Sequence, residues 1–214
     1  MNFSARAALG AATFASAVAL SACAPAPVHY YTLVSPATQT VSATQTVSAT
    51  QPAPFVIDVL PVGIPAQLDQ QQMVVRQGDS GVAVLDNERW SAPLGDELRA
   101  ALSADLVRRL GTQDVAGLPR PPGQSVLAIR LQIRRFDAWP GHAAQLEADW
   151  SLSFAKDPDG ARLTCHSKVV EPAPGGYAEM ASAQQRAIAE LAGQIADGAR
   201  GWAQSRQRSC APHA

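Results

Sequence analysis

Cysteine is scarce in this chain of 214 residues, and its scarcity excludes two kinds of small protein. The three cysteines are Cys23, Cys165 and Cys210. They are too few for a scaffold held mainly by disulfides, and their spacing does not fit a zinc cluster. In an oxidising compartment Cys165 and Cys210 could form a single bridge, so we treat them as a possible disulfide.

Charge is also scarce, and neither sign dominates. Charged residues make up 16% of the chain, with 17 Lys and Arg against 18 Asp and Glu, and the formal net charge is −1. Nucleic-acid binding depends on neutralising many phosphates with basic side chains. The composition therefore gives no electrostatic reason to expect a nucleic-acid partner.

A long apolar run is missing as well. The uncharged, Ala-rich stretch at residues 7–20 falls well short of the roughly 20 apolar residues that a membrane-spanning helix needs, and nothing later in the chain could span. The stretch follows Arg6 and runs into small residues, which is the arrangement of a secretory signal. We therefore expect residues 1–22 to be an export signal.

The last residues of this signal carry a more specific feature. Leu20-Ser-Ala-Cys23 resembles the lipobox that bacterial lipoprotein-processing enzymes read. Only a thiol at that position can become a thioether with diacylglycerol, after which cleavage frees the amine of Cys23 for an N-acyl chain. Several acyl chains hold a protein firmly at a membrane. We therefore expect these chains on Cys23 and no other cofactor.

Two further points concern the cellular location of the protein. Ala24 stands where retention at the inner membrane typically requires Asp, so we expect the protein at the periplasmic face of the outer membrane. The alternative is a soluble exported protein whose signal happens to end in cysteine.

A repeated hexapeptide marks the segment that follows. Thr-Gln-Thr-Val-Ser-Ala occurs at residues 38–43 and again at 44–49, with no charge and no side chain large enough to anchor a core. We interpret residues 23–54 as the lipidated cysteine and a flexible tether. The repeat is either a spacer that holds the domain off the membrane or a loop that tolerates insertion. Residues 29–33 are too aromatic for a linker and are expected to pack on the domain as a short strand.

Patterns of apolar residues predict the folded domain at residues 55–205, with residues 206–214 as a tail. Alternating or β-branched runs predict strands at 55–60, 72–76, 82–85, 127–133, 144–154 and 162–170.

Helical spacing of leucine and alanine predicts two helices. The first follows Pro93 and ends at Gly111, with Glu97, Asp105 and Arg108 on its outer face. The second covers residues 177–203, with an inward line formed by Ile188, Leu191, Ile195, Ala199 and Trp202. The predicted fold is a two-layer α+β domain in which two main helices pack on one face of a largely antiparallel sheet.

Several short motifs follow one another along the mature chain. They are Tyr30-Tyr-Thr-Leu33, Pro61-Val-Gly-Ile-Pro65, Arg89-Trp90, Arg135-Phe136 and Ala148-Asp-Trp150. In this order and spacing they resemble the PqiC family (YmbA-like), the auxiliary lipoproteins of MCE-type lipid transport systems. The resemblance implies an outer-membrane lipoprotein that docks onto a periplasmic MCE-domain protein and, through it, an inner-membrane permease. It also implies membrane lipids as partners and no catalysis; a homo-oligomer is left open.

Three aromatic residues are candidates for the docking surface. They are Trp90, Phe136 and Trp139, because tryptophan and other large anchors dominate many interfaces. The alternative for Trp90 and Phe136 is that they belong to the core. A structural or assembly lipoprotein of an outer-membrane complex is the second function that these observations allow.

A periplasmic hydrolase is the least favoured function. Gly78-Asp-Ser-Gly81 copies the nucleophile segment of trypsin-like proteases, but such a serine needs a histidine base, and the only histidine upstream of Ser80 is His29 in the tether. Gly, Asp and Ser are also the residues that turns prefer.

Other polar residues give no better catalytic or metal site. Glu147 and Asp149 share one face of a predicted strand, which we expect to be solvated. His142 and His166 are expected on a loop and on the outer face of the sheet. We therefore predict no catalytic residue and no metal ligand.

Overall fold

The structure is a computed structural model that describes residues 26–36, 51–157, 159–205 and 210. Its elements, in chain order, are β1 (His29–Tyr31), β2 (Val56–Val59), the short 3-10 helix η2 (Ala66–Leu68), β3 (Gln72–Gln77), β4 (Gly81–Trp90), α2 (Leu94–Leu110), β5 (Val126–Trp139), β6 (Ala143–Phe154), β7 (Leu163–Pro172) and α3 (Tyr177–Ser205). None of the helices within these ranges is long and apolar enough to cross a membrane.

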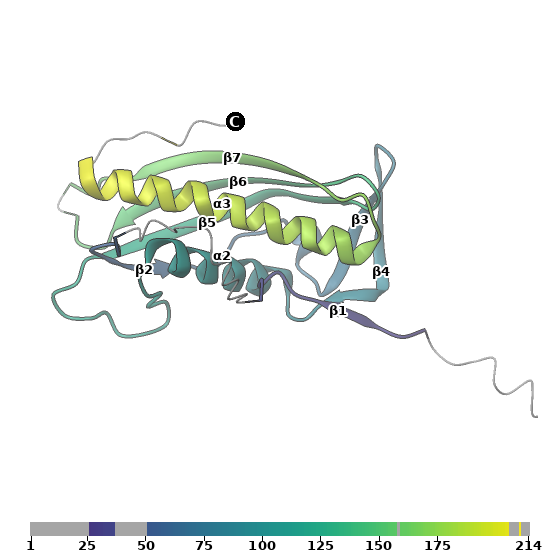
Figure 1. Cartoon of the computed structure of the whole chain (residues 1–214), viewed down its shortest axis with the longest axis horizontal. Helices are drawn as coiled ribbons and strands as arrows, with labels where there is room; N and C mark the ends of the chain where they lie inside the picture. Colours follow the sequence, from purple (N-terminus) through teal and green to yellow (C-terminus); the bar gives the residue numbers. More distant parts are fainter. Residues whose placement is uncertain (1–25, 37–50, 158, 206–209, 211–214) are drawn as a thin grey trace, which may run out of the picture.

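The strands form two sheets. The larger has the order β2-β5-β6-β7 and the smaller the order β1-β4-β3. The pairs β5·β6, β6·β7 and β3·β4 are antiparallel, whereas β1·β4 and β2·β5 are parallel. Both helices lie on one face of the larger sheet, and the smaller sheet stands at one end of it (Figure 1). The α+β class and the mostly antiparallel pairing are confirmed. The division into two sheets was not predicted, because alternation shows which face is buried but not which strands pair.

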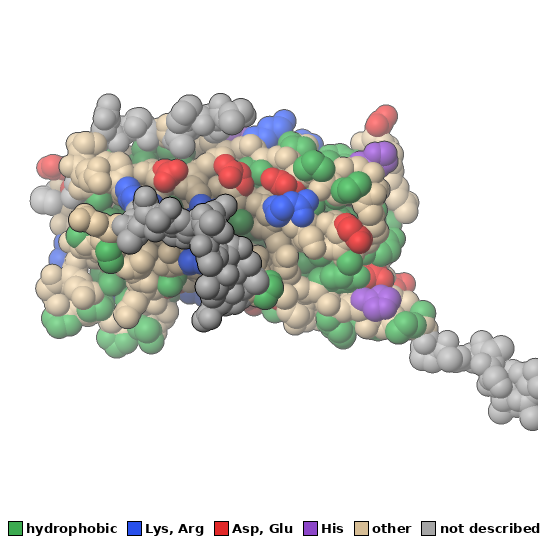
Figure 2. All heavy atoms as spheres, viewed as in Figure 1, with side chains coloured by type: hydrophobic (Ala, Val, Ile, Leu, Met, Phe, Trp, Pro, Cys, Tyr) green, Lys and Arg blue, Asp and Glu red, His purple; other side chains and the backbone are tan. Residues whose placement is uncertain are grey.

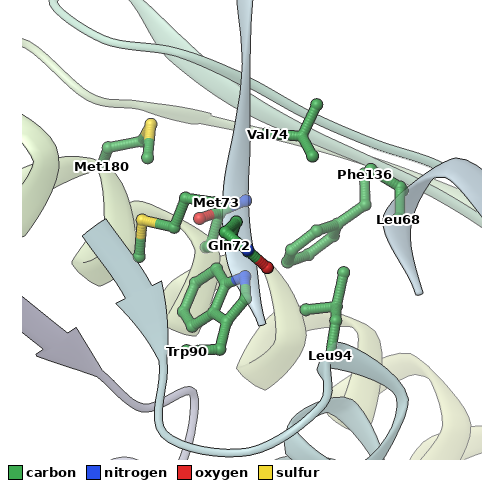
Figure 3. Close-up of a pocket in the computed structure, with 9 residues that line it drawn as sticks. Leu68, Gln72, Met73, Val74, Trp90, Leu94, Phe136 and Met180 are labelled. Atoms are coloured by element: carbon green, nitrogen blue, oxygen red, sulfur yellow. The ribbon is translucent and has the colours of Figure 1, made fainter. Parts of the chain in front are cut away.

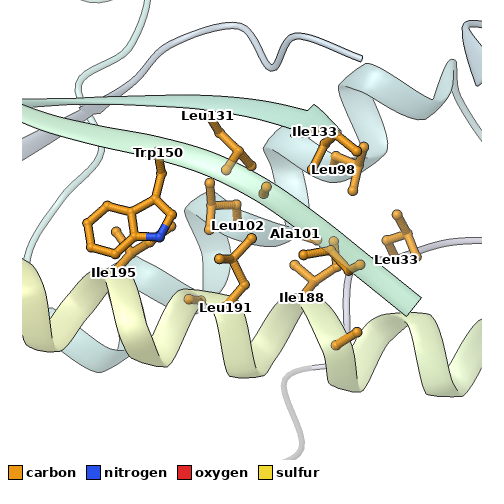
Figure 4. Packing of buried hydrophobic residues seen from close by; sticks show 14 of the residues in the cluster. Leu33, Leu98, Ala101, Leu102, Leu131, Ile133, Trp150, Ile188, Leu191 and Ile195 are labelled. Carbon is orange, nitrogen blue, oxygen red and sulfur yellow. The ribbon is translucent and has the colours of Figure 1, made fainter. Parts of the chain in front are cut away.

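The core lies between the larger sheet and the helices (Figure 4). Leu146, Ala148, Trp150 and Leu152 of β6 are all 2% exposed or less, which confirms the predicted alternation. The five residues of the predicted inward line of α3 are each 1% exposed or less. Helix α3 approaches the sheet closely at Gly198, where a Cβ atom would lie 2.8 Å from the ring of Trp150.

Strand β5 continues past the predicted end at residue 133 because it contains a β-bulge. The pairing with β6 shifts between Ile133 and Arg135, so Arg134 and Arg135 both face solvent. After the bulge the alternation resumes in the opposite phase, and Phe136 is 3% exposed. A bulge inserts one residue and inverts the faces that follow it, which explains why a simple period of two stops at this point.

Helix α2 has the predicted bounds, and Gly111 ends it in a left-handed conformation with φ of 61°. The placement of Glu97 and Asp105 on its outer face is wrong, because both are 4% exposed. Glu97 is covered by the chain at Thr32 and Leu33, and the helical pattern alone does not reveal this contact. Its carboxylate accepts hydrogen bonds from the Leu33 backbone N–H and the Thr32 hydroxyl, each at 2.8 Å, and from the Ser91 hydroxyl.

Within residues 23–54, the short strand expected near residue 30 is present, and it changes where the repeat lies relative to the domain. Residues 29–31 form β1, as expected, and Leu33 is 1% exposed within the core. After the repeat, the backbone again contacts the domain at Ala53, whose N–H donates to the Leu110 carbonyl at 2.8 Å. The repeat falls within residues 37–50, outside the described residues, and it joins two parts of the domain. It therefore does not lie between Cys23 and the first strand of the domain.

Candidate docking surface

Two valines on the β3–β4 hairpin are unusually exposed. Val82 is 57% exposed and Val84 is 51% exposed. Val84 pairs with Val74 and Val82 pairs with Arg76 across the hairpin, so their side chains share one face. This face and strand β5 enclose an open groove of about 370 Å³, which we call the hairpin groove. Its apolar lining includes Pro65 and Leu68.

Arginines flank this apolar floor. Arg76 forms two hydrogen bonds with the Asp137 carboxylate, at 3.1 and 3.2 Å. Arg135 contacts the same carboxylate at 3.3 Å, and Arg134 pairs with Asp149 at 2.6 Å. The side chains of Arg134, Arg135 and Asp149 are each at least 37% exposed, and exposed pairs contribute little to stability. An incoming carboxylate can therefore compete for Arg134 and Arg135 at low cost.

Trp139 lies next to the groove. The Arg76 guanidinium is 5.9 Å from the centre of the Trp139 ring, within the range of a cation–π contact. Trp139, Gly78 and His142 line a second hollow of about 410 Å³ that shares Arg76 with the hairpin groove. Of the three aromatic candidates, Trp139 is the one that remains partly exposed.

Trp90 and Phe136 are each 3% exposed, so neither can contact a partner directly. Both line a narrow cavity of about 10 Å³ beneath the groove, with Leu94 from α2 (Figure 3). Phe136 lines the groove as well as this cavity. The cavity has room for a water-sized group and not for an acyl chain. Phe136 therefore supports the groove from below, and both side chains belong to the core, which is the alternative that the sequence left open for them.

A run of apolar residues in the sequence indicates the groove, whereas the aromatic residues do not. Val82-Ala-Val-Leu85 is apolar at four successive positions, so this part of the strand has no polar face. Only one of the two faces can turn toward the core, because successive side chains point to opposite sides. The other face of such a strand must be covered by another element or remain exposed.

The outer face of the larger sheet carries the charged pairs expected of a solvated surface. The Asp149 carboxylate accepts hydrogen bonds from His166 at 2.8 Å and Arg134 at 2.6 Å, and these bonds lower its pKa. Burial alone would raise the pKa of Glu147, but hydrogen bonds from Gln145 and Lys168 lower it overall. Both carboxylates are therefore held ionised, which does not suit either to donate a proton as a general acid.

The serine of the protease-like segment is not joined to a base. Ser80 lies in the exposed turn of the β3–β4 hairpin. The ring of His29, the only upstream histidine, pairs instead with Glu88 at 2.9 Å. Among the residues that the structure describes, no three His, Cys, Asp or Glu side chains gather to hold a metal ion.

The cysteines fall in different places. Cys23 lies outside the described residues. Cys165 on β7 and Cys210 near the chain end are joined in a disulfide with their Cα atoms 5.7 Å apart. Cys165 is 5% exposed on the core side of β7, so the bridge ties the end of the chain to the larger sheet.

Solved structures show the same fold. One, described as an uncharacterized protein, has 21% sequence identity and a TM-score of 0.62, and the match covers 81% of this chain and 99% of that one. Another, from Xanthomonas campestris, has 18% identity and a TM-score of 0.55, covering 69% and 82% of the two chains. No curated protein matches the sequence.

The family model described as ABC-type transport auxiliary lipoprotein component matches residues 31–196. The chain belongs to this family, which confirms the resemblance found in the sequence. It is a lipoprotein family with an auxiliary role in transport, and it is not a family of known enzymes.

Proposed function

We propose that this protein is an outer-membrane lipoprotein that docks a periplasmic MCE-domain protein and so links an inner-membrane permease to the outer membrane. The lipobox at Cys23 and the residue Ala24 support the location. The family supports an auxiliary role beside a transporter. The hairpin groove carries the docking proposal, because it combines exposed valines with arginines beside them.

The surface charge narrows how such a partner is recognised. Acidic and basic side chains lie interspersed over the helix-bearing face (Figure 2), and the chain is nearly neutral overall. Long-range attraction by one sign of charge is therefore not the main contribution to the binding free energy. Shape and apolar burial at the groove would supply affinity, while local pairing with arginines would fix the orientation.

The partner segment that fits the groove is extended, apolar and acidic at one position. Its apolar side chains would cover Val82 and Val84, which lose contact with water on binding. Its carboxylate would pair with Arg76 or Arg135, both of which already share the Asp137 carboxylate. Trp139, packed beside Arg76, would lie at the edge of the contact.

Val84→Asp tests this docking site. The substitution places a charge in the apolar floor, and we expect at least a tenfold lower recovery of the MCE subunit when the lipoprotein is pulled down from solubilised envelope. The matched control is Val170→Asp, because Val170 is a similarly exposed strand valine, at 54%, but lies on β7. Thermal melting of both variants should match the wild type.

Three outcomes would contradict the proposal. Equal recovery of the MCE subunit with Val84→Asp and wild type would exclude the groove as the site. Recovery of no MCE subunit by the wild type, with other envelope complexes intact, would exclude the docking function. Recovery of an outer-membrane assembly complex in its place would support the structural or assembly alternative.

A further inference from the structure

Strand β1 is fixed tightly to the domain. The Tyr31 hydroxyl donates to the Glu88 carboxylate at 2.6 Å, and the Ser91 backbone N–H donates to the Tyr31 carbonyl at 2.8 Å. Burial and the hydrogen bond to Glu88 raise the pKa of Tyr31 to about 12, so its hydroxyl stays protonated and keeps donating. Just beyond β1, the buried Glu97 binds Thr32 and Leu33.

The chain between Cys23 and β1 is short. Val28 follows Cys23 by five residues, and five fully extended residues span at most roughly 18 Å. Pro25 and Pro27 lie within this link, and proline restricts the backbone further. The hexapeptide repeat follows β1 in the chain and cannot lengthen the link. An acylated Cys23 therefore keeps Val28 close to the bilayer surface.

The outer side of β1 has the composition of a membrane interface. Tyr30 of β1 is 62% exposed, and Val28, immediately before the strand, is 40% exposed. Their spacing of two residues in extended chain places both on the same side. Tyr30 pairs in register with Arg89 of β4, so the arginine shares this face. Tyrosine combines an apolar ring with a polar tip and is enriched where membrane and water meet. Arginine is attracted to anionic headgroups.

We infer that Val28, Tyr30 and Arg89, which we call the membrane edge, rest in the interface of the bilayer that holds Cys23. This inference rests on the proposed lipid anchor. It also sets the direction of the hairpin groove. Strand β4 runs ten residues from Trp90 beside β1 to Gly81 at the hairpin tip, a length of up to roughly 33 Å. The groove near the tip thus lies away from the membrane, where a periplasmic partner can reach it.

Depth-dependent fluorescence quenching tests the inference on the full lipidated protein. Tyr30→Cys carries the fluorophore. Leu118→Cys is the matched control, because Leu118 is similarly exposed, at 64%. It belongs to the loop between α2 and β5, and this loop lies at the other end of the domain from β1 (Figure 1). The vesicles contain phosphatidylethanolamine and phosphatidylglycerol with brominated acyl chains. We expect at least threefold stronger quenching at position 30 than at position 118.

The outcomes separate the edge from the anchor. Three results would overturn the membrane edge and leave the anchor standing, provided that the protein floats with the vesicles. They are equal quenching at the two positions, stronger quenching at position 118, and no quenching at either position. Protein that does not float, or that carries no acyl mass on Cys23, would overturn the anchor and the inference with it. Unchanged thermal melting of the two labelled variants shows that the label reports on folded protein.

Discussion

Replacing Cys23 with serine should block both acylation and cleavage, so that the protein accumulates as unprocessed precursor and nearly all of the acylated mature form is lost from the outer-membrane fraction. A serine hydroxyl cannot form the thioether that lipoprotein processing requires, and each acyl chain adds about 0.8 kcal/mol of binding per buried methylene. Membrane fractionation with intact-mass analysis measures the result. Wild-type protein should show the mass of the acyl chains, and the variant should not.

Cys210→Ser is the matched control for this change. It also replaces a cysteine, here one that forms the bridge to Cys165, but it leaves Leu20-Ser-Ala-Cys23 intact, so the variant should be processed and remain with the membrane. Cleavage of Cys23→Ser after Ala22, with unchanged fractionation, would contradict the proposed anchor.

Replacing Glu97 with alanine should destabilise the domain by about 2–4 kcal/mol, because a buried backbone N–H loses its only charged acceptor in this cluster. The Leu33 N–H donates to Glu97, and the carboxylate also holds Thr32 and Ser91. Loss of these bonds should release β1 first. Urea unfolding gives the free energy, and hydrogen exchange of residues 29–33 shows which segment opens.

Asp96→Ala is the control for Glu97→Ala. Asp96 precedes Glu97 in the first turn of α2 but is exposed, so its loss removes only a favourable contact with the helix dipole, worth about 0.3–1 kcal/mol. Equal unfolding free energies for the two variants would show that the Glu97 cluster does not fix β1.

The sequence predicts the elements of this fold better than their arrangement. The alternation along β6 and the leucine spacing of α2 each report burial directly, because one face of each element meets the core. The partition into two sheets depends on pairing between distant segments, such as His29 with Glu88, and no local pattern encodes it. Glu97 shows the same limit, because the residues that bury it lie more than sixty positions earlier.

The sequence names residues near the proposed docking surface, but it does not reveal which side chains are exposed there. The three aromatic residues chosen from the sequence all lie around the groove and the cavities beside it. Burial of Trp90 and Phe136 is the alternative that the sequence left open, and at Phe136 the period of two does not decide it, because the bulge in β5 inverts the faces. The exposed side chains are the valines of β4, which extend where the hairpin passes beyond the core. Residue type alone favours valine for burial, so only the unbroken apolar run could have indicated them.

In-cell photo-crosslinking from position 84 tests the docking claim most directly. With a photo-reactive amino acid in place of Val84 on the hairpin groove, the account predicts a covalent adduct with an MCE-domain subunit. The same amino acid in place of Val170, which is comparably exposed on β7, should give at most a small fraction of that adduct. An adduct from position 170 but not from position 84, or no adduct with any MCE-domain subunit from a lipoprotein that is correctly localised, would contradict the account.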